Sequence, residues 1–178
     1  MAEFPTIPPY GEERDMLLLF VDQQRATLLW KLEGLTDEQL RQPNPVTGFS
    51  LLGLLKHLVR VEQTWFQQRL MGERIDGGPN DDTAWVPTTD ETFEVLSKQY
   101  RNACIRSNEI ARSLPMDHPT HRPGETADGP SLQWVLLHMI EETARHLGHA
   151  DVIRQSIDGA TGVNPAHARG HSARKADA

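Results

Sequence analysis

The sequence predicts an all-α protein, a four-helix bundle with long crossover loops. Four long stretches show helical periodicity, no stretch alternates as a strand does, and two loops of about 16 residues separate the helices. The chain has 178 residues, of which 38% are apolar and 24% charged, and this composition suits one soluble domain with its own core. We expect residues 1–160 to form a single domain and residues 161–178 a flexible tail.

The first half of the chain predicts two long helices and a short one. Helical spacing over residues 12–33 predicts the first, and Thr36 caps a short turn of helix behind it. Ser50 is the expected N-cap of the second long helix, over residues 50–71. Its buried stripe follows helical spacing through Leu51, Leu54, Leu55, Leu58, Glu62 and Trp65.

The second half predicts two more helices. One begins at a cap formed by Thr88 or Thr89 and runs to about Leu114. The other covers residues 131–157, with Ser131 as its cap. Proline and glycine make residues 72–87 and 115–130 loops, and loops of this length often carry binding function or let helices cross the bundle.

Charge and composition exclude several classes of function. The formal net charge is −7 and the isoelectric point about 5.6, which argues against a nucleic-acid binder and against attachment to an anionic membrane. No apolar stretch approaches the roughly 18 residues that a membrane span needs. One cysteine, Cys104, allows no internal disulfide and predicts a cytoplasmic protein. The oligomeric state stays open, a homodimer included.

The last helix carries the first candidate metal ligands. At 100° per residue, His146 falls inside the apolar face of this helix, and Glu142 lies one turn before it on the flank. Side chains four residues apart lie side by side, so Glu142 and His146 can hold one ion. His149 and His138 share the flank with Glu142; His138 is expected to be an ordinary flank residue, and His149 either the same or a substitute ligand. That apolar face consists of Leu132, Val135, Leu136, Met139, Thr143, Ala150, Ile153 and Ile157.

The second helix offers a third ligand in His57, at the edge of its apolar stripe. Two imidazoles and one carboxylate leave a coordination position open, as in catalytic zinc sites, and also suit iron or nickel. The alternative is that each histidine is a hydrogen-bonded core residue. Glu62 projects onto the centre of the stripe, where an unpaired carboxylate is expensive. We expect it to pair with Arg145 or another cation rather than to face a polar cavity at the metal.

Two segments carry a resemblance to a known family, LLGLLKHLVRVEQTWF in the second helix and HMIEETARHLGHADVIRQSIDG in the last. They resemble the DinB superfamily, in particular its actinobacterial branch related to mycothiol-dependent maleylpyruvate isomerase and the mycothiol S-transferases. The resemblance covers roughly residues 10–160. It implies a DinB-like four-helix bundle holding a divalent metal with three ligands, which match His57, Glu142 and His146. Many DinB proteins have histidine where this chain has Glu142, so His149 remains a rival third ligand.

The resemblance also implies a reaction. Family members use a low-molecular-weight thiol, here mycothiol, activated as a metal-bound thiolate that attacks a small electrophile, a detoxification chemistry. A free thiol has a pKa of about 8.5, whereas a metal-bound thiol is deprotonated. Zinc is the expected metal, with nickel or iron as alternatives. A metal-dependent hydrolase or isomerase of the same fold and a non-enzymatic metal-containing stress protein are the competing interpretations.

Overall fold

The computed structural model describes residues 4–78, 81–122, 124 and 128–165. Within them the regular structure is helical and contains no strand, apart from isolated bridges such as that between Pro119 and Ser131. The long helices are α1 (Glu13–Leu32), α3 (Leu51–Glu62), α4 (Phe93–Ser113) and α5 (Leu132–Asp158). Three short elements join them, namely α2 (Asp37–Arg41), the π-helix η1 (Gln63–Leu70) and the 3-10 helix η2 (Asp82–Trp85). The predicted all-α class is therefore confirmed.

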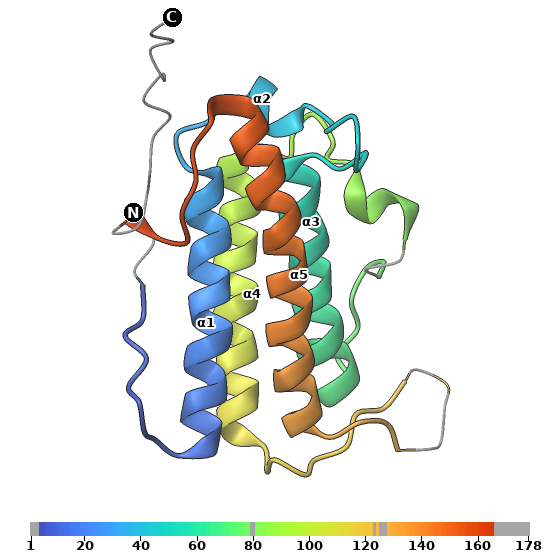
Figure 1. Cartoon of the computed structure of the whole chain (residues 1–178). Helices are drawn as coiled ribbons and strands as arrows, with labels where there is room; N and C mark the ends of the chain where they lie inside the picture. Colours follow the sequence, from blue (N-terminus) through green and yellow to red (C-terminus); the bar gives the residue numbers. More distant parts are fainter. Residues whose placement is uncertain (1–3, 79–80, 123, 125–127, 166–178) are drawn as a thin grey trace, which may run out of the picture.

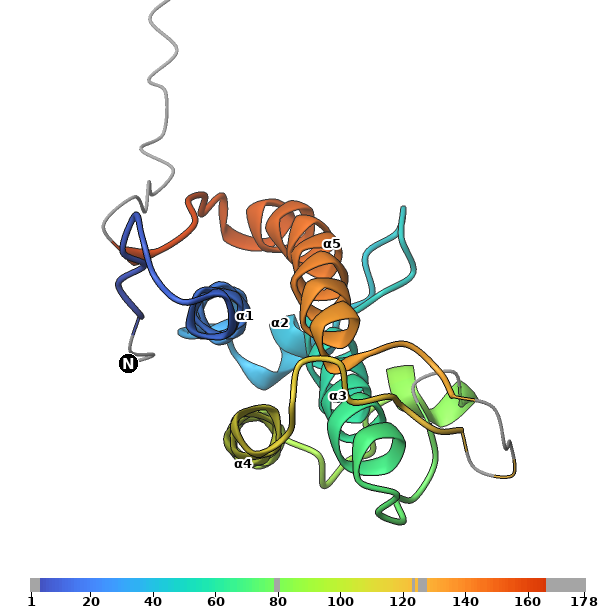
Figure 2. The same cartoon turned by 90° about the horizontal axis from the view of Figure 1, so that it is seen from below.

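The four long helices stand side by side as a bundle (Figure 1). Seen along its length, α1 packs most closely on α5, and α3 on α4 (Figure 2). Leucines from all four helices fill the centre, and α3 is the most deeply buried, with Leu51, Leu52, Leu54, Leu55 and Leu58 excluded from solvent. α3 also packs against α5, and we call the line of contact between these two helices the α3–α5 seam. A polar side chain on this seam can be held by well-packed helices on both sides.

Local capping chemistry sets most helix ends where the sequence predicts them. The Ser50 hydroxyl accepts a hydrogen bond from the Gly53 amide at 3.0 Å, and the Ser131 hydroxyl accepts one from the Trp134 amide at 3.3 Å. Thr36 forms a capping box with Gln39. These contacts confirm the three predicted caps.

The predicted start of the third long helix was wrong. The cap of α4 is Thr92, whose hydroxyl accepts from the Val95 amide at 3.3 Å, rather than Thr88 or Thr89. Glu91 is the reason, because its Oε2 accepts hydrogen bonds from the Thr88 amide at 2.7 Å and from Lys56 Nζ at 2.8 Å. This turn keeps residues 88–91 out of the helix.

The predicted helix over residues 50–71 is continuous but changes type. It is an α-helix to Glu62 and a π-helix from Gln63 to Leu70. The buried residues Glu62, Phe66 and Leu70 recur every four positions, a spacing that lies between the repeats of the two helix types. The apolar pattern therefore could not distinguish them.

The chain continues beyond α5 along α1. Gly159 ends α5 in the left-handed conformation, with a φ of 75°. The Thr27 hydroxyl on α1 then donates to the Val163 carbonyl at 3.1 Å. Residues 166–178 of the predicted tail lie outside the described residues. No helix of the described chain is long and apolar enough to cross a membrane.

Candidate metal centre

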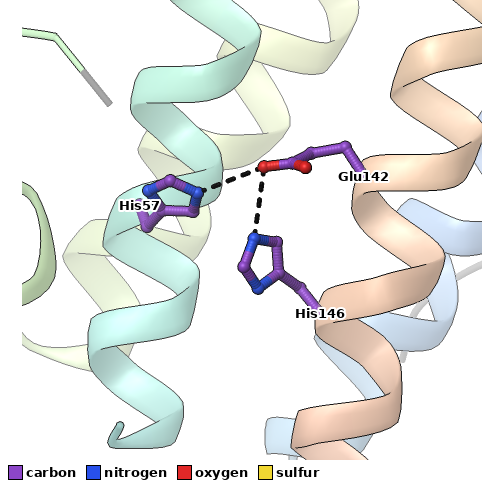
Figure 3. Close-up of side chains that lie close together, drawn as sticks. All are labelled: His57, Glu142 and His146. Carbon is purple, nitrogen blue, oxygen red and sulfur yellow. Dashed lines mark hydrogen bonds and ion pairs between the residues drawn. The ribbon is translucent and has the colours of Figure 1, made fainter. Parts of the chain in front are cut away.

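Three side chains from two helices converge between α3 and α5 (Figure 3). His57 comes from α3, and Glu142 and His146 lie one turn apart on α5. Their ligand atoms all lie within 4.8 Å of one another. His57 and His146 are only 5% and 7% exposed, whereas 18% of the Glu142 side chain is exposed. The cluster therefore lies at the edge of the core, with the carboxylate on its open side.

The separations of the ligand atoms fit a single metal ion. Oε1 of Glu142 lies 3.4 Å from Nε2 of His57 and 3.2 Å from Nε2 of His146. Ligand atoms about 2.1 Å from a tetrahedral zinc ion lie about 3.4 Å from each other. Hydrogen bonds have similar lengths, so these distances suit both a metal-loaded and a metal-free site. The donor set of two nitrogens and one oxygen suits zinc, iron or nickel.

The two imidazoles keep Glu142 ionised. The hydrogen bond from His146, followed by that from His57, lowers the pKa of Glu142 well below its usual range, although partial burial raises it. The anion is the form of a carboxylate that binds a metal. The Nδ1 atom of His146 is buried and has no hydrogen-bond partner among the described residues.

An aromatic stack packs against the His57 ring. Trp85 of η2 stacks on His57 with ring centroids 3.8 Å apart and planes 16° apart. Phe49 also stacks on Trp85, with ring centroids 4.6 Å apart and planes 21° apart. Gly53, one turn before His57, permits this approach, because a Cβ there would overlap the Trp85 carbonyl oxygen. The stack fixes the plane in which His57 presents its nitrogen.

A comparison with protein families gives this geometry a context. The model of the mycothiol-S-transferase family matches residues 16–159, most of the chain. The chain belongs to this family. The matched stretch includes His57, Glu142, His146 and the aromatic stack. It also includes α3, α4, α5 and all of α1 except its first three residues. The resemblance drawn from the two helical segments is thereby confirmed, while a search of curated proteins found no match.

In this member of the mycothiol-S-transferase family, Glu62 belongs to a separate ion pair. Its two oxygens accept hydrogen bonds from Nε and Nη2 of Arg25 at 2.7 and 2.6 Å, and Oε2 accepts a third from the Ser107 hydroxyl at 2.7 Å. Arg145, the partner named first from sequence, bonds instead to Glu141 on the surface of α5. Glu62 thus pairs with another cation, as preferred, and does not join the cluster.

The other two candidate histidines lie on either side of the cluster along α5. His149 has its ring centroid 5.7 Å from that of His146 and packs edge-on against Phe49 at 5.5 Å. It is not part of the group of converging ligand atoms. His138 stacks on Trp134 at 4.9 Å, and its Nδ1 lies 3.5 Å from Oε2 of Glu141, which agrees with a flank residue.

Sequence reasoning missed Phe49 and the role of Gly53, and it did not place Trp85 beside His57. Phe49 and Trp85 lie outside the long helices, where no periodicity indicates which way a side chain points. Gly53 lies inside a helix, where a glycine costs stability relative to alanine. That cost was the one available signal of a close approach.

Proposed function

We propose that this protein is an enzyme, a mycothiol S-transferase that transfers the thiol of mycothiol to a small electrophile at a metal site formed by His57, Glu142 and His146. The observation that carries the proposal is the convergence of two buried imidazoles and one anionic carboxylate in a member of this family. Three protein ligands leave a coordination position open, as catalytic metal sites require. We place the reaction in the cytoplasm, where mycothiol would be in its reduced form.

Each of the three side chains contributes a defined property. His57 and His146 bind as neutral bases, and their burial holds the two nitrogens in place. Glu142 brings the negative charge and moderates the Lewis acidity of the centre. A divalent ion, zinc by preference, would supply one thing, a lowered pKa for a thiol bound to it. The stacked Trp85 and Phe49 rings keep water from one side of His57.

The protein's own cysteine is a poor nucleophile, which favours an external thiol. Burial raises the pKa of Cys104 well above its ordinary value, so this thiol stays protonated at neutral pH. Cys104 lies on α4 and is not among the converging ligand atoms.

Elemental analysis tests the site. Purified protein should contain close to one divalent ion per chain, and His57→Ala and His146→Ala should lose it. Glu142→Gln should weaken metal binding by at least the roughly 10–100-fold that follows loss of even an outer-shell partner. His149→Gln is the matched control and should bind metal nearly as tightly as the wild type. Tight binding by Glu142→Gln with loss in His149→Gln would reverse the assignment.

A conjugation assay tests the reaction. The metal-loaded protein should join mycothiol to a model electrophile, and cysteine or glutathione at the same concentration should react far more slowly. Hydrolysis of an ester without any thiol, combined with no conjugation, would favour the hydrolase interpretation instead. Full metal content with neither activity would favour the non-enzymatic one.

A further inference from the structure

A row of ring-bearing and charged side chains runs along the α3–α5 seam away from the candidate metal centre. On α5 its members follow one another at steps of four residues: His146, Glu142, His138 and Trp134. On the facing side they are His57 in α3 and Trp65 and Arg69 in η1. Four residues of helix advance by about 6 Å, so His138 lies one step and Trp134 two steps from Glu142. The two sides of the seam thus continue in register past the metal ligands.

Contacts across the seam connect this row. The rings of His57 and His146 lie 4.9 Å apart at the buried end. Further along, Trp65 approaches His138 at 4.9 Å and Trp134 at 5.4 Å, and Trp134 stacks on His138 with only 18° between their planes. These three rings, which we call the aromatic platform, form one cluster that begins a single helical turn from Glu142.

The platform opens to solvent at its far end. Trp134 is 45% exposed, although a large aromatic side chain usually buries most of its surface. The guanidinium of Arg69 lies over the Trp65 ring, 4.1 Å from its centroid. The Arg69 carbonyl accepts a hydrogen bond from the His121 amide at 2.8 Å, so part of the long loop between α4 and α5 is anchored at this end. Solvent therefore reaches the ring of Trp134 on the same seam as the ligands.

We propose that the aromatic platform of Trp65, Trp134 and His138 binds the electrophile and selects planar, electron-poor aromatic compounds. Indole rings are electron-rich and stack with electron-poor rings. Stacking against an already ordered ring costs little conformational entropy, because His138 and Trp65 hold Trp134 in place. The class of substrate rests on the proposed function, whereas the binding surface does not.

The proposed reaction is the substitution of a leaving group on an aromatic ring by the thiol of mycothiol. With 1-chloro-2,4-dinitrobenzene, a C–S bond forms between the mycothiol sulfur and the ring carbon, and the C–Cl bond breaks. Chloride leaves with the bonding electron pair, and the thiol proton passes to solvent. The platform begins one helical turn from Glu142, so an electrophile bound on it lies on the same seam as the proposed site of the thiol.

Binding is tested without any reaction. 1,3-Dinitrobenzene has the same electron-poor ring and no leaving group, and it can be titrated calorimetrically into the purified full-length protein. Trp134→Leu should weaken its binding about two- to tenfold, the range expected for loss of one aromatic stack. Trp30→Leu, which removes an indole from α1 at a distance from the seam, should leave binding unchanged. Equal affinity of Trp134→Leu and wild type would overturn the proposal, as would equal weakening by both variants.

Kinetics then separate this inference from the proposed function. The kcat/KM for 1-chloro-2,4-dinitrobenzene and for iodoacetamide is measured with mycothiol as the second substrate. The ratio of the first value to the second should be severalfold lower in Trp134→Leu than in wild type. An unchanged ratio, or a rise in KM for mycothiol alone, would assign the platform to the thiol and overturn the proposal. If wild type conjugates neither electrophile but binds 1,3-dinitrobenzene through Trp134, the proposed function fails while the binding surface stands.

Discussion

Replacing Glu62 by glutamine should be among the most destabilising conservative changes in this protein. Glu62 ends α3, Arg25 lies on α1 and Ser107 on α4, so three helices meet at one carboxylate. Glutamine has nearly the same volume, and it leaves the packing in place. What it removes is the negative charge that faces a buried guanidinium.

The expected magnitude follows from burial and geometry. Glu62 is 0% exposed and Arg25 4%, and three hydrogen bonds of 2.6–2.7 Å satisfy the carboxylate. In Glu62→Gln one oxygen becomes an amide donor directed at another donor. Among the described residues, the Arg25 cation then keeps Asp22, whose side chain is 32% exposed, as its one charged partner. Breaking one partner of a buried ion pair costs about 3–5 kcal/mol. That is a large part of the roughly 5–15 kcal/mol that stabilises a domain.

Urea unfolding followed by circular dichroism measures the loss. With an m value of about 2 kcal/mol per M, the midpoint should fall by about 2 M. Glu73→Gln is the matched control: it breaks the exposed pair with Arg106, which solvent screens, and should shift the midpoint far less. Equal midpoints for Glu62→Gln and Glu73→Gln would refute the reasoning. Loss of bound metal in folded Glu62→Gln would instead place Glu62 in the metal centre.

Three further predictions concern single residues. Gly53→Ala should lower the melting temperature and alter tryptophan emission, because its Cβ must displace Trp85 from His57, and an unchanged spectrum would contradict this. Gly148→Ala should raise the free energy of unfolding by about 0.5–1 kcal/mol, since a Cβ at this position in the helix meets open space. A lower free energy of unfolding, measured by urea titration, would contradict this. Burial raises the pKa of Glu91, but hydrogen bonds from Lys56 and from a backbone amide outweigh it, and the pKa is lowered. This stabilisation is present above the unfolded-state pKa of about 4.3 and is lost as the pH falls through the folded-state pKa. The difference in melting temperature between wild type and Glu91→Gln should therefore shrink on acidification. A constant difference would show that the charge is not responsible.

Local sequence patterns predicted most of the helices and one half of the candidate site. Helical periodicity and caps such as Ser50 and Ser131 depend on neighbouring residues, so they can be recognised locally. The pairing of Glu142 with His146 is equally local, because a helix places side chains four residues apart next to each other. His57 was named from its place on an apolar edge, together with the family resemblance.

Contacts between residues far apart in the sequence could not be predicted from local patterns. His57 and Glu142 are 85 positions apart, and their 3.4 Å contact depends on how closely α3 packs on α5. The choice of Arg25 as the partner of Glu62 depends on the same packing, as does the start of α4 at Phe93, since Lys56 holds Glu91 outside the helix. The stacking of Trp85 on His57 depends on an absent side chain at Gly53. Periodicity predicts which face of a helix is buried, whereas the packing between helices determines which residues that face contacts.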